Sequence, residues 1–113
     1  MTGTGPTVWY HVRDLDRARS FYKDTLGFDE TAVDFAERWA HLVRGEMAIG
    51  LAEGEPQEGG VAHVDVADVK AEAERLRAAG VKVGVVVEIP HGEMRLLDVY
   101  DPDGNRIQLA QEL

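Results

Sequence analysis

The chain of 113 residues contains no cysteine. This absence excludes disulfide bonds, thiolate nucleophiles and metal sites with sulfur ligands. The sequence also lacks an apolar run of about 18 residues, and no charged segment followed by an apolar one stands at its N-terminus. Neither a membrane span nor a secretory signal peptide is therefore predicted, and we expect a cytoplasmic protein with no membrane partner.

Basic residues are scarce, since 12 Lys and Arg stand against 21 Asp and Glu and the net charge is −9. Nucleic-acid-binding domains carry clusters of Lys and Arg that neutralise phosphates, so this balance argues against nucleic acid as a partner. Small cationic molecules remain candidate ligands. An acidic surface also favours solubility alone, so charge by itself does not establish a ligand.

Two copies of one pattern organise the chain. In the first copy, apolar and mixed residues alternate over 7–12, Asp14 is suited to cap a helix and Gly27 to end it. The second copy repeats these features at 61–66, Asp68 and Gly80. Each half alone would be marginally stable, so the repetition predicts two halves that share one core.

Further strands are predicted after each helix, so that the order β-α-β-β-β occurs twice. Their ranges are 29–36, 37–44 and 47–52 in the first half, and 82–89, 94–100 and 105–111 in the second. We predict an α+β fold in which two paired βαβββ modules form a curved mixed sheet with the helices on its outer face. The expected single domain covers 1–113, with module 1 over about 7–52, an acidic linker at 53–60 and module 2 over about 61–111.

Three stretches make this pattern specific: DLDRARSFYKDTLGF, the Asp-capped second helix and the closing DPDGNRIQLAQ. Together they resemble the vicinal oxygen chelate superfamily, which includes glyoxalase I, extradiol dioxygenases, fosfomycin-resistance enzymes and bleomycin-resistance proteins. The resemblance runs from Thr7 to Gln111. It implies paired modules and, for a short chain, a homodimer. It does not imply one activity, because this fold hosts several.

Members that resemble glyoxalase I bind a metal through His residues at the starts of the first and fifth strands and Glu residues on the fourth and last strands. The matching positions here are Thr7, Val61, Gly50 and Gln108. These residues offer no suitable donor set for a divalent cation. The resemblance is therefore closest to bleomycin-resistance-like members that lack the metal ligands, and no cofactor is predicted. A displaced metal site is a less favoured alternative and would use His11, His41, His63 or Asp65.

The mixed faces of the strands are predicted to line the open side of the sheet. Candidate ligand-binding residues are Trp9, His11, Phe35, Trp39, His41, Gly50, His63, Asp65 and Gln108. The tryptophans, with Phe35 and Tyr10, lie near the small Ala48 and Gly50, which predicts an aromatic-walled groove for a flat and cationic small molecule. The alternative is that both tryptophans belong to the ordinary core.

Three classes of function stay open. The first is a non-catalytic protein that sequesters a small molecule. The second is a lyase, isomerase or dioxygenase-like enzyme that uses a displaced metal or a histidine base. His63 is the best candidate base, although its partner Asp65 lies about 7 Å further along the strand. The third is an accessory subunit. Ser20 is not expected to be a nucleophile, and His91 is expected on a surface loop.

Overall fold

The computed structural model describes residues 7–57, 59–89 and 93–113. In chain order the elements are β1 (Val8–Val12), α1 (Leu15–Ser20), the π-helix η1 (Phe21–Thr25), β2 (Asp29–Asp34), β3 (Trp39–Arg44), β4 (Met47–Glu53), β5 (Ala62–Asp65), α2 (Val69–Ala78), β6 (Val87–Glu88), β7 (Met94–Tyr100) and β8 (Arg106–Glu112). No helix in the described part is long and apolar enough to cross a membrane.

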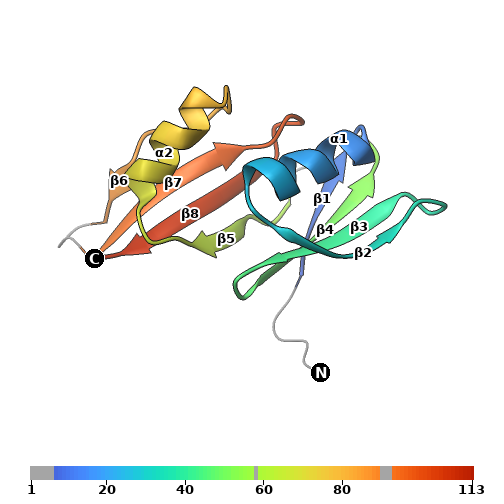
Figure 1. Ribbon diagram of the computed structural model, residues 1–113, viewed down its shortest axis with the longest axis horizontal. Coiled ribbons are helices and arrows are strands. Elements are labelled where there is room, and N and C mark those ends of the chain that lie inside the picture. Colours follow the sequence, from blue (N-terminus) through green and yellow to red (C-terminus); the bar gives the residue numbers. More distant parts are fainter. Residues whose placement is uncertain (1–6, 58, 90–92) are drawn as a thin grey trace.

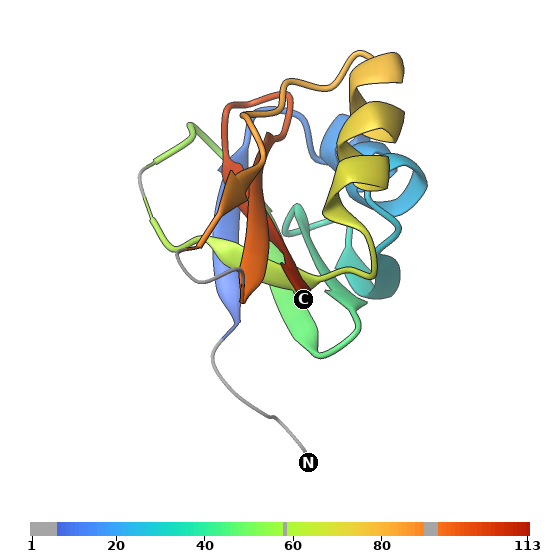
Figure 2. The same ribbon diagram turned by 90° about the vertical axis from the view of Figure 1, so that its left-hand side faces the viewer.

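The strands form two four-stranded sheets with the same internal order, β1-β4-β3-β2 and β5-β8-β7-β6. In each sheet the first strand runs parallel to the last strand of its module, and the other neighbours are antiparallel. Figure 1 shows the two sheets side by side with both helices on one side of them. Figure 2 shows the linker between β4 and β5 on the opposite side. The predicted α+β fold of paired βαβββ modules is confirmed.

The start of each helix repeats one capping arrangement. The Asp14 carboxylate accepts the backbone N–H of Arg17 at 3.1 Å, and the Asp68 carboxylate accepts that of Ala71 at 3.1 Å. These bonds satisfy backbone donors that have no partner within the helix. After the helices, Gly27 and Gly80 have φ of 75° and 80°, a left-handed conformation that glycine adopts without strain. The predicted caps and stops are confirmed.

The two helices differ by one residue, because the stretch from Asp14 to Gly27 is one residue longer than that from Asp68 to Gly80. The extra residue is absorbed by the π-helical turn η1, where the N–H of Leu26 donates to the carbonyl of Phe21 at 3.1 Å. Helix α2 contains no such turn. A single insertion in the repeat therefore changes the helix type locally and leaves the sheet unchanged.

A buried polar network joins the modules at the turn between β7 and β8. The hydroxyl of Tyr22, which is fully buried, donates to Asp101 at 2.8 Å. The Asn105 side-chain amide donates to Asp101 and to the backbone carbonyl of His11, both at 2.9 Å. Burial, together with the nearby Asp101 charge, raises the pKa of Tyr22 well above its ordinary value. This turn of module 2 is thus fixed to module 1.

Tyr10 makes a second buried link. Its hydroxyl donates to the carbonyl of Arg106 at 2.6 Å and accepts the N–H of Ala62 at 2.8 Å. Burial raises the pKa of Tyr10 to about 12. Because both partners belong to module 2, this side chain of β1 closes the junction between the sheets.

Across the molecule, the turn between β3 and β4 contacts α2. Arg44 donates to Glu72 at 2.9 Å and to the carbonyl of Leu26 at 2.7 Å. Burial alone would raise the pKa of the Glu72 carboxyl, but hydrogen bonds from Arg44 and Arg75 hold it below its ordinary value. Each module therefore contacts the helix of the other through its last hairpin.

Three strand predictions are wrong in extent. The strand expected over 29–36 ends at Asp34, where the chain enters the turn before β3. The strand expected over 82–89 is interrupted, because Val83 lies opposite Val99 whereas Val87 lies opposite Leu96, which leaves one extra residue on the outer strand. The strand expected from 37 begins at Trp39, because Arg38 has a positive φ of 58° in the turn. The predicted break at 90–92, with His91, lies outside the described residues.

Candidate functional site

The open face of module 1, on the side of the sheet away from the helices, carries four large rings around two small residues. We call this surface the ring face: Trp9, His11, Trp39 and His41 around Gly50 and Ala52. In the strand register, Gly50 of β4 lies between Trp9 of β1 and His41 of β3. The rings of Trp9 and His41 have centroids 6.5 Å apart and planes inclined by 50°. Two rings thus border one glycine.

In the next row of the ring face the histidine lies on β1 and the tryptophan on β3, the reverse of the first row. Ala52 of β4 lies between His11 of β1 and Trp39 of β3. Between the two rows, Leu51 and its neighbour Ala40 are buried on the helix side of the sheet. The period-two alternation of the strands therefore separates this surface from the core, and neither Trp9 nor Trp39 is among the buried core residues.

Trp9 explains why residue 50 is glycine. A Cβ atom at Gly50 would lie within 3.0 Å of the Trp9 indole, closer than real Cβ atoms come to other atoms. Trp9 is nevertheless 47% exposed, so its outer surface is open to solvent. The Trp9 ring thus fills the space left by the small residues of β4. Its outer side offers a flat apolar surface.

Two of the predicted groove aromatics lie elsewhere. Phe35 belongs to the turn after β2, and its ring packs under the guanidinium of Arg19 at 4.9 Å, beside helix α1. Tyr10 points into the core and is only 4% exposed. The structure therefore brings Trp9, His11, Trp39, His41 and Gly50 together and leaves these two side chains out.

The open face of module 2 is charged. We call it the polar face: His63, Asp65, Asp98, Arg106 and Gln108. Gln108 lies opposite both His63 and Asp98 in the register and donates to Asp98 at 3.4 Å. His63 Nε2 and Asp65 Oδ1 are 3.7 Å apart, longer than a hydrogen bond. The other three predicted site residues thus share this second surface.

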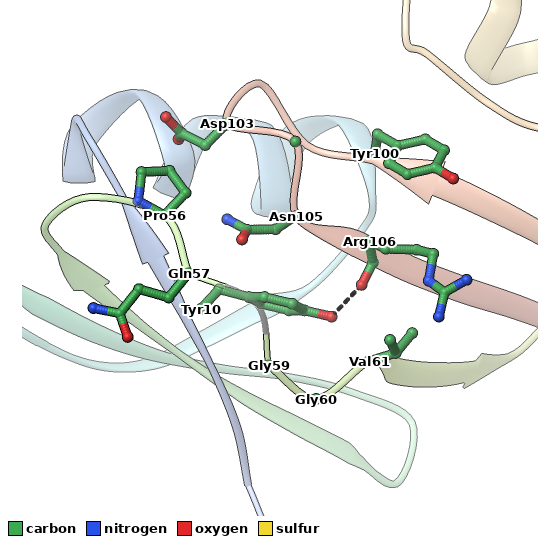
Figure 3. Close-up of a pocket in the computed structure, with 11 residues that line it drawn as sticks. Tyr10, Pro56, Gln57, Gly59, Gly60, Val61, Tyr100, Asp103, Asn105 and Arg106 are labelled. Atoms are coloured by element: carbon green, nitrogen blue, oxygen red, sulfur yellow. Dashed lines mark hydrogen bonds between the residues drawn. The ribbon is translucent and has the colours of Figure 1, made fainter.

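A cavity of about 530 Å³ lies between the linker and the start of β8 (Figure 3). It contains none of the candidate ligand-binding residues. Its lining is Tyr10, Pro56, Gln57, Gly59, Gly60, Val61, Tyr100, Asp103, Gly104, Asn105 and Arg106. In Figure 3 the linker residues face the turn before β8 across this space, and the Tyr10 hydroxyl meets the carbonyl of Arg106. Sequence reasoning missed this cavity because the linker lacks periodicity.

A second cavity of about 420 Å³ is lined by His63 and Asp65 together with residues of the β3–β4 turn, Arg44, Gly45, Glu46 and Met47. It joins the edge of the polar face to module 1. Among the described residues, no three His, Asp or Glu side chains lie together in a way that could hold a metal ion.

Thr31 contacts His41 of the ring face, and the sequence did not indicate this contact. Glu30 pairs with Leu42 and Ala32 pairs with His41, so Thr31 is an extra residue that bulges from β2. Its hydroxyl lies 3.1 Å from both Nδ1 and the backbone carbonyl of His41. A bulge has no signature in strand periodicity, which explains why the sequence did not indicate this contact.

The residues at the superfamily's metal positions do not fit a metal ion. Gly50 has no side chain, and the Trp9 indole covers it. Val61 is apolar and lines the first cavity, whereas Gln108 carries a neutral amide that bonds Asp98. With Thr7, these residues supply no carboxylate or imidazole ligand.

Comparison with known proteins identifies the family. The model of the Glyoxalase/Bleomycin resistance protein/Dioxygenase superfamily matches residues 6–109. No curated protein matches the chain. Among solved structures, the antibiotic-binding protein TnmS3 from Streptomyces sp. CB03234 has 26% identity and a TM-score of 0.76, with 100% of each chain covered.

Two other similar structures share less of the sequence. The fosfomycin resistance protein FosX from Listeria monocytogenes has 19% identity and a TM-score of 0.80, covering 100% of this chain and 96% of its own. Lactoylglutathione lyase from Agrobacterium tumefaciens has 20% identity and a TM-score of 0.74, covering 98% and 95%. The match of the family model extends over nearly all elements, so the chain belongs to the Glyoxalase/Bleomycin resistance protein/Dioxygenase superfamily.

Proposed function

We propose that the protein binds a flat aromatic small molecule on the ring face and releases it unchanged. The observation that carries this proposal is the exposed Trp9 indole over Gly50, with the ring of His41, from β3, at a centroid distance of 6.5 Å. Stacking on such a ring stabilises an aromatic ligand, and a positively charged ligand gains a further about 0.5–2 kcal/mol over an indole face. The net charge of −9 favours the encounter with a cation.

The similarity to an antibiotic-binding protein supports sequestration over catalysis. On this proposal the ring face binds without a metal, because the Trp9 indole occupies the position from which a carboxylate ligand would extend at residue 50. Elemental analysis of protein purified without an affinity tag tests the metal-free state. Stoichiometric Ni²⁺, Zn²⁺, Mn²⁺ or Fe²⁺ would contradict it.

Titration with a bleomycin-type cationic aromatic compound tests the proposal. We expect saturable quenching of tryptophan fluorescence, weaker at high ionic strength, with the compound recovered unchanged by mass spectrometry. Trp39→Ala should weaken binding by about 1 kcal/mol or more. Phe35→Ala is the matched control, because this exposed ring lies off the ring face and its loss should leave affinity unchanged. No quenching by a panel of such compounds would defeat the proposal.

A second candidate function rests on the cavity of about 420 Å³ that His63 and Asp65 line. There His63 could act as a base on a small substrate, with Asp65 at 3.7 Å and Arg44 in the same wall. A ligand recovered in altered form would favour this enzyme. His63→Ala should then abolish the conversion and leave quenching of Trp9 and Trp39 in place.

Assembly and location complete the proposal. We propose one domain over 1–113 that forms a homodimer, because short members of this superfamily pair their modules across a two-fold axis, and we propose a cytoplasmic location. Size-exclusion chromatography with light scattering decides the assembly, and a monomer near 12.5 kDa at micromolar concentration would contradict it. Coincident unfolding by fluorescence and circular dichroism tests the single domain. Fractionation of the source cells tests the location.

A further inference from the structure

His41 stands on the ring face with one side of its imidazole fixed. The hydroxyl of Thr31 lies 3.1 Å from the carbonyl oxygen of His41 and 3.1 Å from its Nδ1. A bulge in β2 produces this double contact, since Thr31 is the extra residue between the pairs Glu30–Leu42 and Ala32–His41. Bulges of this kind redirect a side chain and occur often beside functional sites.

The two contacts determine which nitrogen of His41 carries the hydrogen. A carbonyl oxygen only accepts hydrogen bonds, so the contact with it uses the single hydroxyl hydrogen of Thr31. The Thr31 oxygen must then accept at its second contact, and Nδ1 of His41 must donate. In the neutral ring the other nitrogen, Nε2, therefore bears a lone pair.

This lone pair lies next to the surface that the proposed function uses. In the strand register His41 lies opposite Gly50, and its ring centroid is 6.5 Å from that of Trp9. No side chain in the described ranges makes a hydrogen bond to Nε2. A flat molecule stacked on Trp9 would bring its edge to this acceptor.

We infer that Thr31 holds His41 as the Nδ1–H tautomer, so that Nε2 accepts a hydrogen bond from an O–H or N–H group on the edge of a ring bound at Trp9. The ligand half of this inference rests on the proposed function and narrows it to aromatic molecules with a hydrogen-bond donor. The tautomer half stands on the two contacts between Thr31 and His41 alone. In these terms His41 contacts the ligand, and Thr31 is a positioning residue.

Long-range ¹H–¹⁵N NMR of uniformly labelled protein measures the tautomer directly, at about pH 8 so that imidazoles are mainly neutral. We expect the His41 signals, assigned by their loss in His41→Ala, to show a protonated Nδ1 and an unprotonated Nε2. Thr31→Ser keeps the hydroxyl and should keep this pattern, whereas Thr31→Val should lose it. A protonated Nε2 in the native protein, or an unchanged pattern in Thr31→Val, would overturn the inference.

Two matched probes test the acceptor, 2-naphthol and 2-methoxynaphthalene, which differ in the donor hydrogen. We expect the native protein to bind 2-naphthol about three- to tenfold more tightly, the range of one hydrogen bond. Thr31→Val should reduce this preference. Thr25→Val, a matched change on the helix side of the molecule in η1, should retain it.

The outcomes separate the two proposals. Binding of both probes with equal affinity would overturn the role of His41 while the ring face remained a binding surface. Binding of neither probe would defeat the proposed function and the ligand half of the inference together. The NMR pattern would still decide whether Thr31 sets the tautomer of His41.

Discussion

Modules 1 and 2 have the same strand order and the same capped helix, yet their open faces carry opposite chemistry. Module 1 presents rings around Gly50 and Ala52, whereas module 2 presents charged and amide groups such as Asp98 and Gln108. On the helix side both modules bury aliphatic residues at matching places, such as Leu15 and Val69. This difference shows that residues packed against a helix have the same character in both modules, whereas residues on the open face differ between them.

The largest expected effect comes from the turn that locks module 2 to module 1. Asp101→Ala should lower the free energy of unfolding by about 3 kcal/mol or more, because the Tyr22 hydroxyl and the N–H of Asn105 lose a buried acceptor. Urea unfolding measures it. The matched control is Glu46→Ala in the corresponding turn of module 1, where the exposed side chain should contribute less than about 0.5 kcal/mol. Equal effects at the two turns would contradict this asymmetry.

The ring face provides the next test. Gly50→Ala should lower the free energy of unfolding by about 1–3 kcal/mol, because the added Cβ collides with the Trp9 indole. Gly54→Ala, whose Cβ would meet His11 at an ordinary 3.6 Å, is the control and should be nearly neutral. In the Trp9→Ala background, Gly50→Ala should lose most of its cost. Additive effects of Trp9→Ala and Gly50→Ala would show that the indole does not cover the glycine.

The features that both modules share through local periodicity and helix capping were predictable from the sequence. The positions of Asp14 and Asp68, the glycine stops and the order of elements follow from spacing, and the structure has them. The π-helical turn was visible only as a one-residue difference in length. Whether one extra residue produces a π-helical turn depends on how the helix packs over the sheet, and residue spacing alone does not show this packing.

The candidate site was predictable only in part. Alternation indicated that Trp9 and His41 share an open face, and the register confirms that they flank Gly50. It could not show that the Trp9 ring itself fills the space above that glycine. Phe35 was misplaced because the strand expected to reach residue 36 ends at Asp34, so Phe35 lies in the following turn with its ring against Arg19. Bulges and turns shift a side chain to another face without changing composition.

Alkaline pH should weaken the junction between the modules, because the two buried phenols of module 1, Tyr10 and Tyr22, bond residues of module 2 there. The folded pKa of Tyr10 is raised to about 12, so the fold favours the protonated phenol. Its contribution to stability is complete below the ordinary value of about 10 and is lost as the pH rises toward 12. Thermal unfolding measured from about pH 8 upward should show this decline. Tyr10→Phe should flatten the decline, and an identical slope in that variant would assign it to other groups.

The smallest expected effect concerns how the last strand of each module supports its helix. The Gln111 amide oxygen accepts the N–H of Val69 at 2.9 Å, and the Glu53 carboxylate accepts that of Leu15 at 3.0 Å. Gln111→Ala should cost about 0.5–1 kcal/mol, the range for losing a cap, at any salt concentration, because the amide is neutral.

Glu53 differs because Arg38 also binds its carboxylate, at 2.9 Å. The hydrogen bond from Arg38, with that from the N–H of Leu15, lowers the pKa of Glu53, so its contribution is present above the ordinary carboxyl range and lost as the pH falls. Glu53→Ala should therefore lower the melting temperature more at low salt than near 1 M, where the Debye length is about 3 Å. Melting curves of both variants at the two salt concentrations measure the contrast. If the loss in Glu53→Ala did not depend on salt, the charge of this carboxylate would not matter. Glu53 would then serve module 1 only as a hydrogen-bond acceptor for the helix, as the neutral Gln111 amide serves module 2.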